Sequence, residues 1–297
     1  MTFRERWLTT LAVGYIFMYF SEFLFWANHT PSGETLLMWL VYSLAAYIFL
    51  SVLALYRVRN LYALFLAGAV YGWLLEGVIV QTMYAVFPFQ IAFTGLSWHA
   101  LLDVLVGWYL IRKTLFENNA RKLAVLLIIV GGMRGIWAVS WWVEDKTLPS
   151  VGQFAVFSLW STLATIPAYW GMNRPFQPHK IELRILVGMA VLLFILVVVL
   201  IPFAVLILPP LLWLIFRALR RHRESAAPPQ IDLIFPGRIR RIDYALLLLL
   251  PLTATGVFAV LYDLLFATIA VFAIITVPIS VILFVRSLIR LGRESPA

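Results

Sequence analysis

The sequence predicts an all-α, polytopic integral membrane protein with about ten transmembrane helices. Of its 297 residues, 63% are hydrophobic and only 12% are charged, and the charges mostly flank long apolar runs. Soluble domains are roughly half apolar and about a quarter charged, so the composition indicates that the lipid bilayer is the solvent. The chain contains no cysteine, which excludes disulfides, thiolate metal ligands and cysteine nucleophiles.

Six regular spans are expected in the first part of the chain. A helix needs roughly 20 residues to cross a bilayer, and six apolar runs are close to that length: 7–26, 35–56, 61–84, 96–111, 123–142 and 151–170. The first run is longer than the apolar core of a signal peptide, so we expect it to remain as a span. These six helices define a predicted membrane region, residues 1–184.

Two tight hairpins are expected after this region. Residues 185–216 are too long for one comfortable span, and arginines precede and follow them, so we expect a hairpin that turns near Pro202. Residues 217–244 are basic and contain Pro and Gly turns, and they predict a cytoplasmic linker. Residues 245–297 predict a second hairpin, turning at Tyr262 and Asp263, followed by a basic tail.

The charges of the loops predict the orientation. Basic residues collect in alternate loops, namely Arg4, Arg6, Arg57, Arg59, Arg112, Lys113, Arg121, Lys122, Arg174, Lys180 and Arg184. By the positive-inside rule these loops and both termini lie in the cytoplasm, most simply of a bacterial-type inner membrane or a plasma membrane. The net charge of +9 is then a topology signal, and we expect no nucleic-acid partner.

Three charged residues are expected at one depth inside the membrane. Counted at 1.5 Å per residue from the predicted outer ends, Glu76, Asp103 and Arg134 each lie about 11–12 Å below the outer surface. Charges in hydrocarbon cost several kcal/mol and usually serve a function. We expect the three side chains to meet, with Arg134 between the two carboxylates.

Other polar residues extend this predicted site. His99 lies four residues before Asp103 and shares its helix face, and Glu22 and Trp98 lie nearer the outer surface. Ser158, Ser161, Thr162 and Thr165 form a hydroxyl stripe on the sixth span. We therefore predict catalytic roles for three residues, Glu76, Asp103 and His99. We predict substrate-binding roles for five, Arg134, Glu22, Trp98, Ser158 and Thr162.

The leading functional hypothesis is a site, open to the extracytoplasmic side, for an amphipathic or lipid-like substrate. Two carboxylates in a low dielectric suit acid–base chemistry such as isomerisation, cyclisation or hydrolysis, but no motif decides whether the protein is an enzyme. A proton- or cation-coupled transporter is one alternative. The other is a non-catalytic subunit or assembly factor in which buried charges fix helix pairing and the hydroxyl stripe is helix–helix glue.

No cofactor and no metal is expected. One histidine without a second histidine nearby, and without an HExxH motif, is a weak basis for a zinc site. The expected partners are membrane lipids and an amphipathic small molecule, and the sequence does not predict the oligomeric state.

Overall fold

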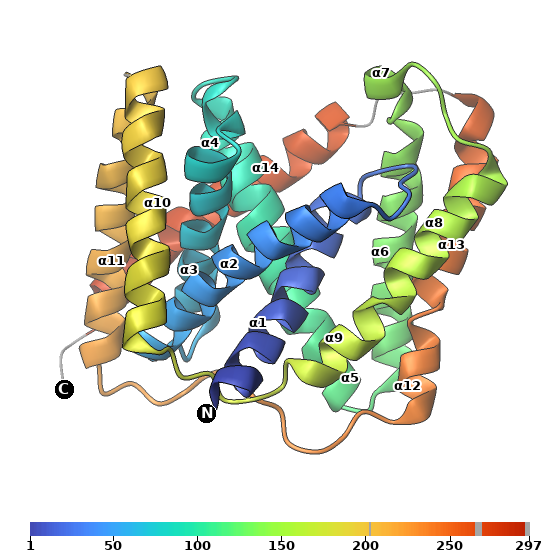
Figure 1. Cartoon of the computed structure of the whole chain (residues 1–297). Coiled ribbons are helices and arrows are strands. Elements are labelled where there is room, and N and C mark those ends of the chain that lie inside the picture. The colour runs from blue at the N-terminus through green and yellow to red at the C-terminus, as the bar shows by residue number, and fades with distance from the viewer. Residues whose placement is uncertain (202, 265–268, 295–297) are drawn as a thin grey trace.

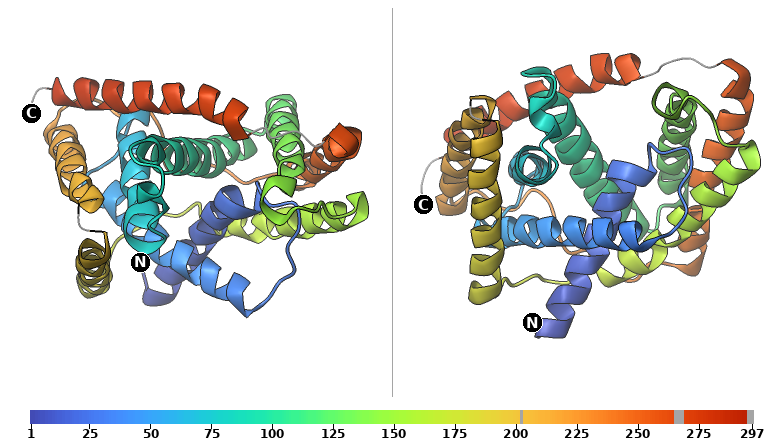
Figure 2. Two further views of the ribbon diagram at one scale, coloured as in Figure 1. Left: turned by 90° about the horizontal axis from the view of Figure 1, so that it is seen from above. Right: turned by 45° about the horizontal axis from the view of Figure 1, so that its top comes forward.

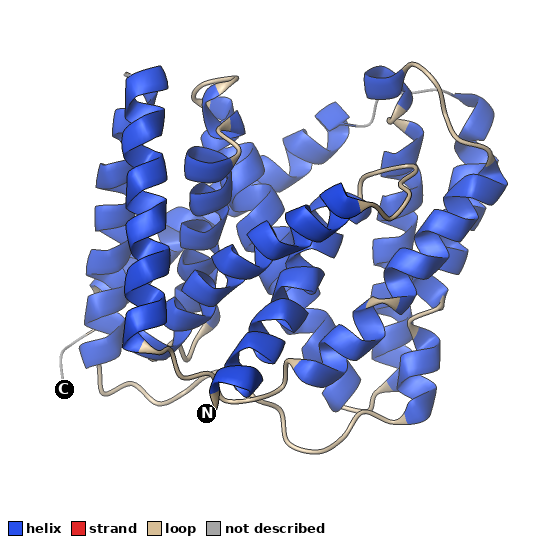
Figure 3. Ribbon diagram, viewed as in Figure 1, coloured by secondary structure: helices blue, strands red, loops and turns tan. Residues whose placement is uncertain are grey.

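A computed structural model of the chain describes residues 1–201, 203–264 and 269–294. These residues form helices and connecting loops, with no strand among them (Figure 3). Pro202, at the expected turn of the first hairpin, lies outside the described residues.

The first part of the chain fills the centre of the molecule and one side of it (Figure 1). Its helices are α1 (Phe3–Met18), η1 (Tyr19–Phe23), α2 (Gly33–Leu55), α3 (Leu61–Leu74), η2 (Leu75–Ile79), η3 (Thr82–Tyr84), α4 (Phe89–Ala92), η4 (Phe93–Ile111), α5 (Arg112–Phe116), α6 (Ala120–Val139), α7 (Trp142–Asp145), α8 (Val151–Leu163) and α9 (Thr165–Gly171).

The second half lies at the periphery. It consists of α10 (Lys180–Leu200), η5 (Ala204–Ile207), α11 (Leu208–Glu224), α12 (Arg241–Leu246), α13 (Leu249–Leu261), η6 (Tyr262–Leu264) and α14 (Ile269–Gly292). In both orientations of Figure 2, α10 and α11 stand together at one side of the molecule, and α13 stands at the opposite side.

Eight helices of the described chain are long and apolar enough to cross a membrane. They are Gly33–Leu55, Leu61–Ile79, Phe89–Phe116, Ala120–Val139, Val151–Gly171, Lys180–Leu200, Arg241–Leu264 and Ala270–Gly292. Multi-pass membrane embedding is therefore supported, with eight candidate spans against the ten expected.

Two expected spans are absent from these eight. The first helix, α1 with η1, carries Arg4, Glu5, Arg6 and Glu22, and α11 has only 17 residues, four of them arginines. Both exist as helices, so the disagreement concerns their length and charge. The number of spans and the cytoplasmic position of the termini stay predictions.

Capping residues begin the helices at the end of the molecule where the basic loops collect. Asn60 and Asn119 accept hydrogen bonds from backbone N–H groups in the first turns of α3 and α6, and Thr2 does the same for α1. Such caps satisfy donors that a helix cannot satisfy itself. The hydrogen bonds from Thr2 also hold the pKa of the Glu5 carboxyl below its usual value. The N-terminus lies at this same end of the molecule (Figure 1).

The segment between α11 and α12 is an ordered strap across the basic end. The backbone N–H groups of Gln230 and Ile231 donate to the Arg59 carbonyl at 2.8 and 3.2 Å. Asn173 exchanges two hydrogen bonds with the Phe235 backbone, at 2.8 and 3.0 Å. The strap therefore joins the loop between α2 and α3 to the loop between α9 and α10.

Helices α3 and η4 pack closely enough to bring buried polar side chains together. A Cβ atom at Gly72 would collide with the Gly95 backbone oxygen and lie 2.8 Å from His99 Cβ, and one at Gly68 would lie 3.0 Å from Ala100 Cα. Small residues allow this backbone-to-backbone approach between membrane helices. The same approach positions the site described next.

Candidate functional site

Three of the acidic residues lie on π-helical segments. Glu22 is in η1, Glu76 is in η2, and Asp103 is in the 19-residue η4 together with His99. π-Helical turns are rare and occur frequently at functional sites. Nothing in the side-chain spacing used above predicts them.

Glu76, His99 and Asp103 form one hydrogen-bonded triad. His99 Nε2 lies 2.8 Å from Glu76 Oε1, and His99 Nδ1 lies 2.7 Å from Asp103 Oδ2. The exposed fraction of the side chains falls from 12% at Glu76 to 1% at His99 and 0% at Asp103. The triad therefore runs from the edge of the helix bundle into its interior.

Two hydroxyl groups complete the triad. The Thr82 hydroxyl donates to Glu76 Oε2, and the Tyr71 hydroxyl donates to Asp103 Oδ2 at 3.2 Å. The second oxygen of Asp103, Oδ1, is buried without a hydrogen-bond partner. A buried acceptor without a partner is costly and usually has a specific reason.

Tyr71 also closes the triad on its inner side. Its ring lies 4.2 Å from the ring of Phe17 and 6.2 Å from that of Phe49, measured between centroids, and both phenylalanines are fully buried. The polar chain that begins at Glu76 therefore ends against aromatic packing.

Glu22 and Trp98 lie beside the triad. The Tyr42 hydroxyl donates to Glu22 Oε1 at 2.6 Å and lies 2.7 Å from Ser21 Oγ, and the Trp98 indole donates to the Ser21 carbonyl at 3.0 Å. Segment η1, which carries Glu22, packs on η4, which carries Asp103. Segment η1 thus brings a third carboxylate near the triad.

The structure does not place Arg134 between the two carboxylates. Its guanidinium donates to the Tyr19 hydroxyl at 2.8 Å and to Ser161 Oγ at 3.2 Å, and none of the ion pairs in the described chain includes it. The Arg134 side chain is completely buried and its Nε atom has no acceptor. The expectation that all three charges meet is therefore corrected: the acids meet through His99, and the arginine lies in a second cluster.

Part of the hydroxyl stripe belongs to this second cluster. Thr162 Oγ1 lies 2.8 Å from the Tyr19 hydroxyl, and Ser161 Oγ also donates to the Phe157 carbonyl of its own helix. Ser158 Oγ is buried without a partner. The rings of Tyr19, Phe154 and Phe157 surround the guanidinium at 5.1–5.8 Å, which adds cation–π attraction.

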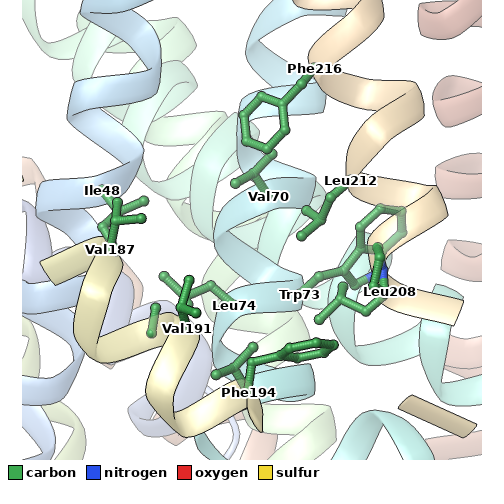
Figure 4. A pocket seen from close by; sticks show the side chains of 13 residues that line it. Ile48, Val70, Trp73, Leu74, Val187, Val191, Phe194, Leu208, Leu212 and Phe216 are labelled. Carbon is green, nitrogen blue, oxygen red and sulfur yellow. The ribbon is translucent and has the colours of Figure 1, made fainter. Parts of the chain in front are cut away.

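A purely apolar cavity lies beside α3 and η2, the helix that carries Glu76. It has a volume of about 330 Å³ and is lined by residues of α2, α3, η2, α10 and α11, ten of which are labelled in Figure 4. Leu74 and Val78 line it and flank Glu76 along the chain. Glu76, His99 and Asp103 are not among its lining residues.

The described residues contain no group of three His, Cys, Asp or Glu side chains arranged to hold a metal ion. Both His99 nitrogens are already occupied by carboxylates. The triad therefore offers proton transfer as its own chemistry, because a histidine between two carboxylates can shift a proton to either side.

The sequence-based prediction omitted several participating residues. Tyr71, Tyr42 and Tyr19 each donate to a predicted site residue or lie within hydrogen-bond distance of one, and Thr82 donates to Glu76. Their signal was a polar hydroxyl within or at the end of an apolar run, which is weak because tyrosine is common in membrane helices.

Comparison of the chain with protein-family models, with curated proteins and with solved structures finds no match, so the geometry described above is what supports a function.

Proposed function

We propose that the protein is a membrane-embedded acid–base enzyme that transfers protons to and from an amphipathic, lipid-like substrate at Glu76, His99 and Asp103. One observation carries this proposal: His99 lies between two carboxylates whose exposure decreases inward. Intramembrane chains of Asp, Glu and His are characteristic of proton transfer.

Each residue of the triad has a distinct role. Glu76 is the least buried member, so it accepts a proton from the substrate or returns one to it. His99 passes the proton between Glu76 and the interior, and Asp103 orients the imidazole and stabilises its positive charge. Because the proton stays within the triad between the two transfers, one substrate molecule is rearranged without net uptake of a proton.

The apolar cavity supports a substrate with a hydrocarbon tail. Its lining is apolar throughout, and it adjoins the helix segment that carries Glu76. Helix α10, which forms one wall, has only 11% of its most apolar stretch buried, so the cavity lies beside a lipid-facing helix. If the tail of the substrate were held there, its reacting part would lie near Glu76 in η2.

The Arg134 cluster is proposed to bind an anionic part of the substrate. The arginine is fully buried, lacks a carboxylate partner among the described residues and retains an unpartnered Nε. Segment η1 carries both Tyr19, which contacts Arg134, and Glu22, and it packs on η4, which carries Asp103. It would therefore connect binding at Arg134 to the triad.

Proton-coupled transport is the second candidate, favoured by the same hydrogen-bonded chain. A transporter needs a path that continues to the opposite side of the membrane. The packing of Tyr71 against Phe17 and Phe49 favours the enzyme, because it blocks the chain at its inner end.

The test is a comparison of lipid extracts by mass spectrometry from cells that lack the gene and from cells complemented with variants. Wild type and Glu34→Gln, a change at an exposed glutamate in the first turn of α2, should restore the same lipid species. Glu76→Gln should not, because glutamine keeps the hydrogen-bonding shape and removes the proton-transfer group.

The Glu76→Gln protein must be folded for this comparison to count, and its thermal unfolding in detergent should match that of wild type. Complete restoration by folded Glu76→Gln would contradict an acid–base mechanism. Imposed proton gradients in proteoliposomes distinguish the transporter: proton-driven uptake of a substrate that is recovered chemically unchanged would favour it over the enzyme.

A further inference from the structure

A second site lies at the basic end of the molecule, away from the triad. The last turns of α14 and the first turn of α3 enclose a cavity of about 490 Å³. Its lining residues are Tyr62, Arg286, Ile289, Arg290, Arg293 and Glu294. Helix α14 packs against both α3 and α11.

Two arginines of this cavity, Arg286 and Arg290, share one face of α14, and Arg293 directly follows the end of the helix. Positions 286 and 290 are four residues apart, which places their side chains one above the other. Within the described chain, none of the three forms an ion pair or a side-chain hydrogen bond. All three are exposed, so their donors are available to a ligand.

The carboxylate in the cavity is already engaged elsewhere. Glu294 Oε2 lies 2.8 Å from His222 Nδ1, and Glu294 Oε1 accepts from Asn60 Nδ2 at 3.2 Å. Three arginines and one glutamate leave the cavity with a formal charge of +2. The first turn of α3 adds the positive end of a helix dipole.

Other arginines at this end are used within the protein. Arg6 pairs with Glu182, Arg59 donates to the carbonyls of His222 and Ser225, Arg112 donates to the Leu233 carbonyl, and Arg240 pairs with Asp243. The donors of the three arginines of the cavity have no partner in the described chain, and unlike the other unpaired arginines of this end, such as Arg4, Arg121 and Arg238, the three line one cavity.

The surroundings favour a ligand that is both anionic and apolar. Exposed apolar side chains, among them Ile282, Val285 and Ile289, run along α14 directly before and between the arginines. A free anion would use the guanidinium groups alone, whereas a lipid would also cover this apolar surface. A planar guanidinium group can donate two parallel hydrogen bonds to two oxygens of one phosphate. Basic pockets between membrane helices bind anionic headgroups.

We propose that this cavity binds the phosphate headgroup of an anionic phospholipid from the leaflet at the basic end, with its acyl chains along α14. The bound lipid would neutralise the arginines and hold α14 against α3. This proposal is independent of the triad and does not require that the protein be an enzyme.

Native mass spectrometry of the full-length protein in detergent tests it. The protein is titrated with phosphatidylglycerol, with phosphatidylcholine of the same chains, and with inorganic phosphate. Each arginine near a membrane surface contributes about 1 kcal/mol to anionic-lipid attraction, which corresponds to roughly fivefold in affinity. Arg290→Gln should therefore weaken phosphatidylglycerol binding by roughly fivefold, and Arg286→Gln, Arg290→Gln and Arg293→Gln together by on the order of a hundredfold.

The matched control replaces three other arginines of the same end, Arg4→Gln, Arg121→Gln and Arg238→Gln, and should leave binding unchanged. If the α14 triple variant fails to fold, the Arg290→Gln titration decides alone. Equal binding of phosphatidylcholine, equal losses in the control, or occupancy by inorganic phosphate without a preference for lipid would each overturn the proposal.

Discussion

The helix formed by α3 and η2 is less apolar than α10 but much more buried. In a soluble protein the more apolar helix would be the more buried one. The span Leu61–Ile79 has a mean hydropathy of 1.6 and 78% of its most apolar stretch is buried, whereas Lys180–Leu200 has a hydropathy of 3.0 and only 11% is buried. Lipid tails are as apolar as leucine, so apolar residues gain little from leaving them. Burial in this protein therefore follows the polar groups, which need partners.

By this comparison, the protein divides into an enclosed region that holds the polar groups and peripheral helices that face lipid. The first half of the chain encloses the triad and the Arg134 cluster, whereas α10 and α14 present apolar side chains outward. The predictions below test whether stability depends on the enclosed region much more than on the peripheral helices.

The largest effect is expected from Phe17→Ala. Phe17 is completely buried against Phe49 and Tyr71, and truncating such a side chain typically costs about 3–5 kcal/mol. Leu192→Ala, at a leucine of α10 that is 69% exposed, should change the free energy of unfolding little. Denaturant titration followed by tryptophan fluorescence measures both, and similar losses would remove the distinction between the regions.

Gly72→Leu is expected to have the next largest effect. The new side chain would push against the Gly95 backbone and His99, whereas a Cβ atom at Gly256 meets nothing within 4 Å. Overpacking typically costs about 1–3 kcal/mol. The midpoint temperature of thermal unfolding in detergent should fall for Gly72→Leu and not for Gly256→Leu. Equal shifts of this midpoint would contradict the close packing of α3 on η4.

Arg134→Met should cost little or even stabilise the fold. A buried cation without an anionic partner is unfavourable, and apolar replacement of buried charges is often neutral or stabilising by about 1–4 kcal/mol. Arg6→Met is the control, because it removes the two hydrogen bonds, of 2.6 and 2.7 Å, that the Arg6 guanidinium donates to the Glu182 carboxylate. A midpoint for Arg134→Met below that of Arg6→Met would mean that Arg134 is mainly structural.

Labelling of single cysteines tests orientation. The chain has no cysteine of its own. Cysteines at Ser32 and Thr147 should react with an impermeant reagent in intact cells, and those at Ala120 and Glu224 should not. The opposite labelling would place the basic end outside.

Much of the helix pattern followed from hydropathy and charge. The expected runs 35–56, 123–142 and 151–170 correspond to Gly33–Leu55, Ala120–Val139 and Val151–Gly171. The structure also has a helix on each side of the expected turn near residue 202, α10 and α11. Hydropathy succeeded because a spanning backbone must satisfy its own hydrogen bonds, which leaves helices as the available form.

The site was predicted only in part. The spacing of His99 and Asp103 indicated a shared face, and the two side chains lie 2.7 Å apart. Arg134 was misplaced because equal depth says nothing about lateral position: α6 packs on α13, where Gly131 and Gly135 meet the Leu250 and Ala254 backbone, and its arginine faces Tyr19 and Ser161. Residue counts from a single sequence give the depth of a side chain along the membrane normal. They do not determine which helices are neighbours.

The π-helical segments have a consequence for how the chain can change. A turn closed by a bond from residue i to residue i+5 holds one residue more than an α-helical turn. Deleting Leu75, the residue before Glu76 in η2, would let the turn close as an ordinary helix and move Glu76 back by one position, which is about 100° of rotation around an α-helix. The phase of Glu76 relative to His99 would then shift although no polar side chain had been removed. The deletion of one codon can thus break the hydrogen bond between the Glu76 carboxylate and the His99 imidazole. The site therefore depends on the number of residues in this helix turn as well as on their identity.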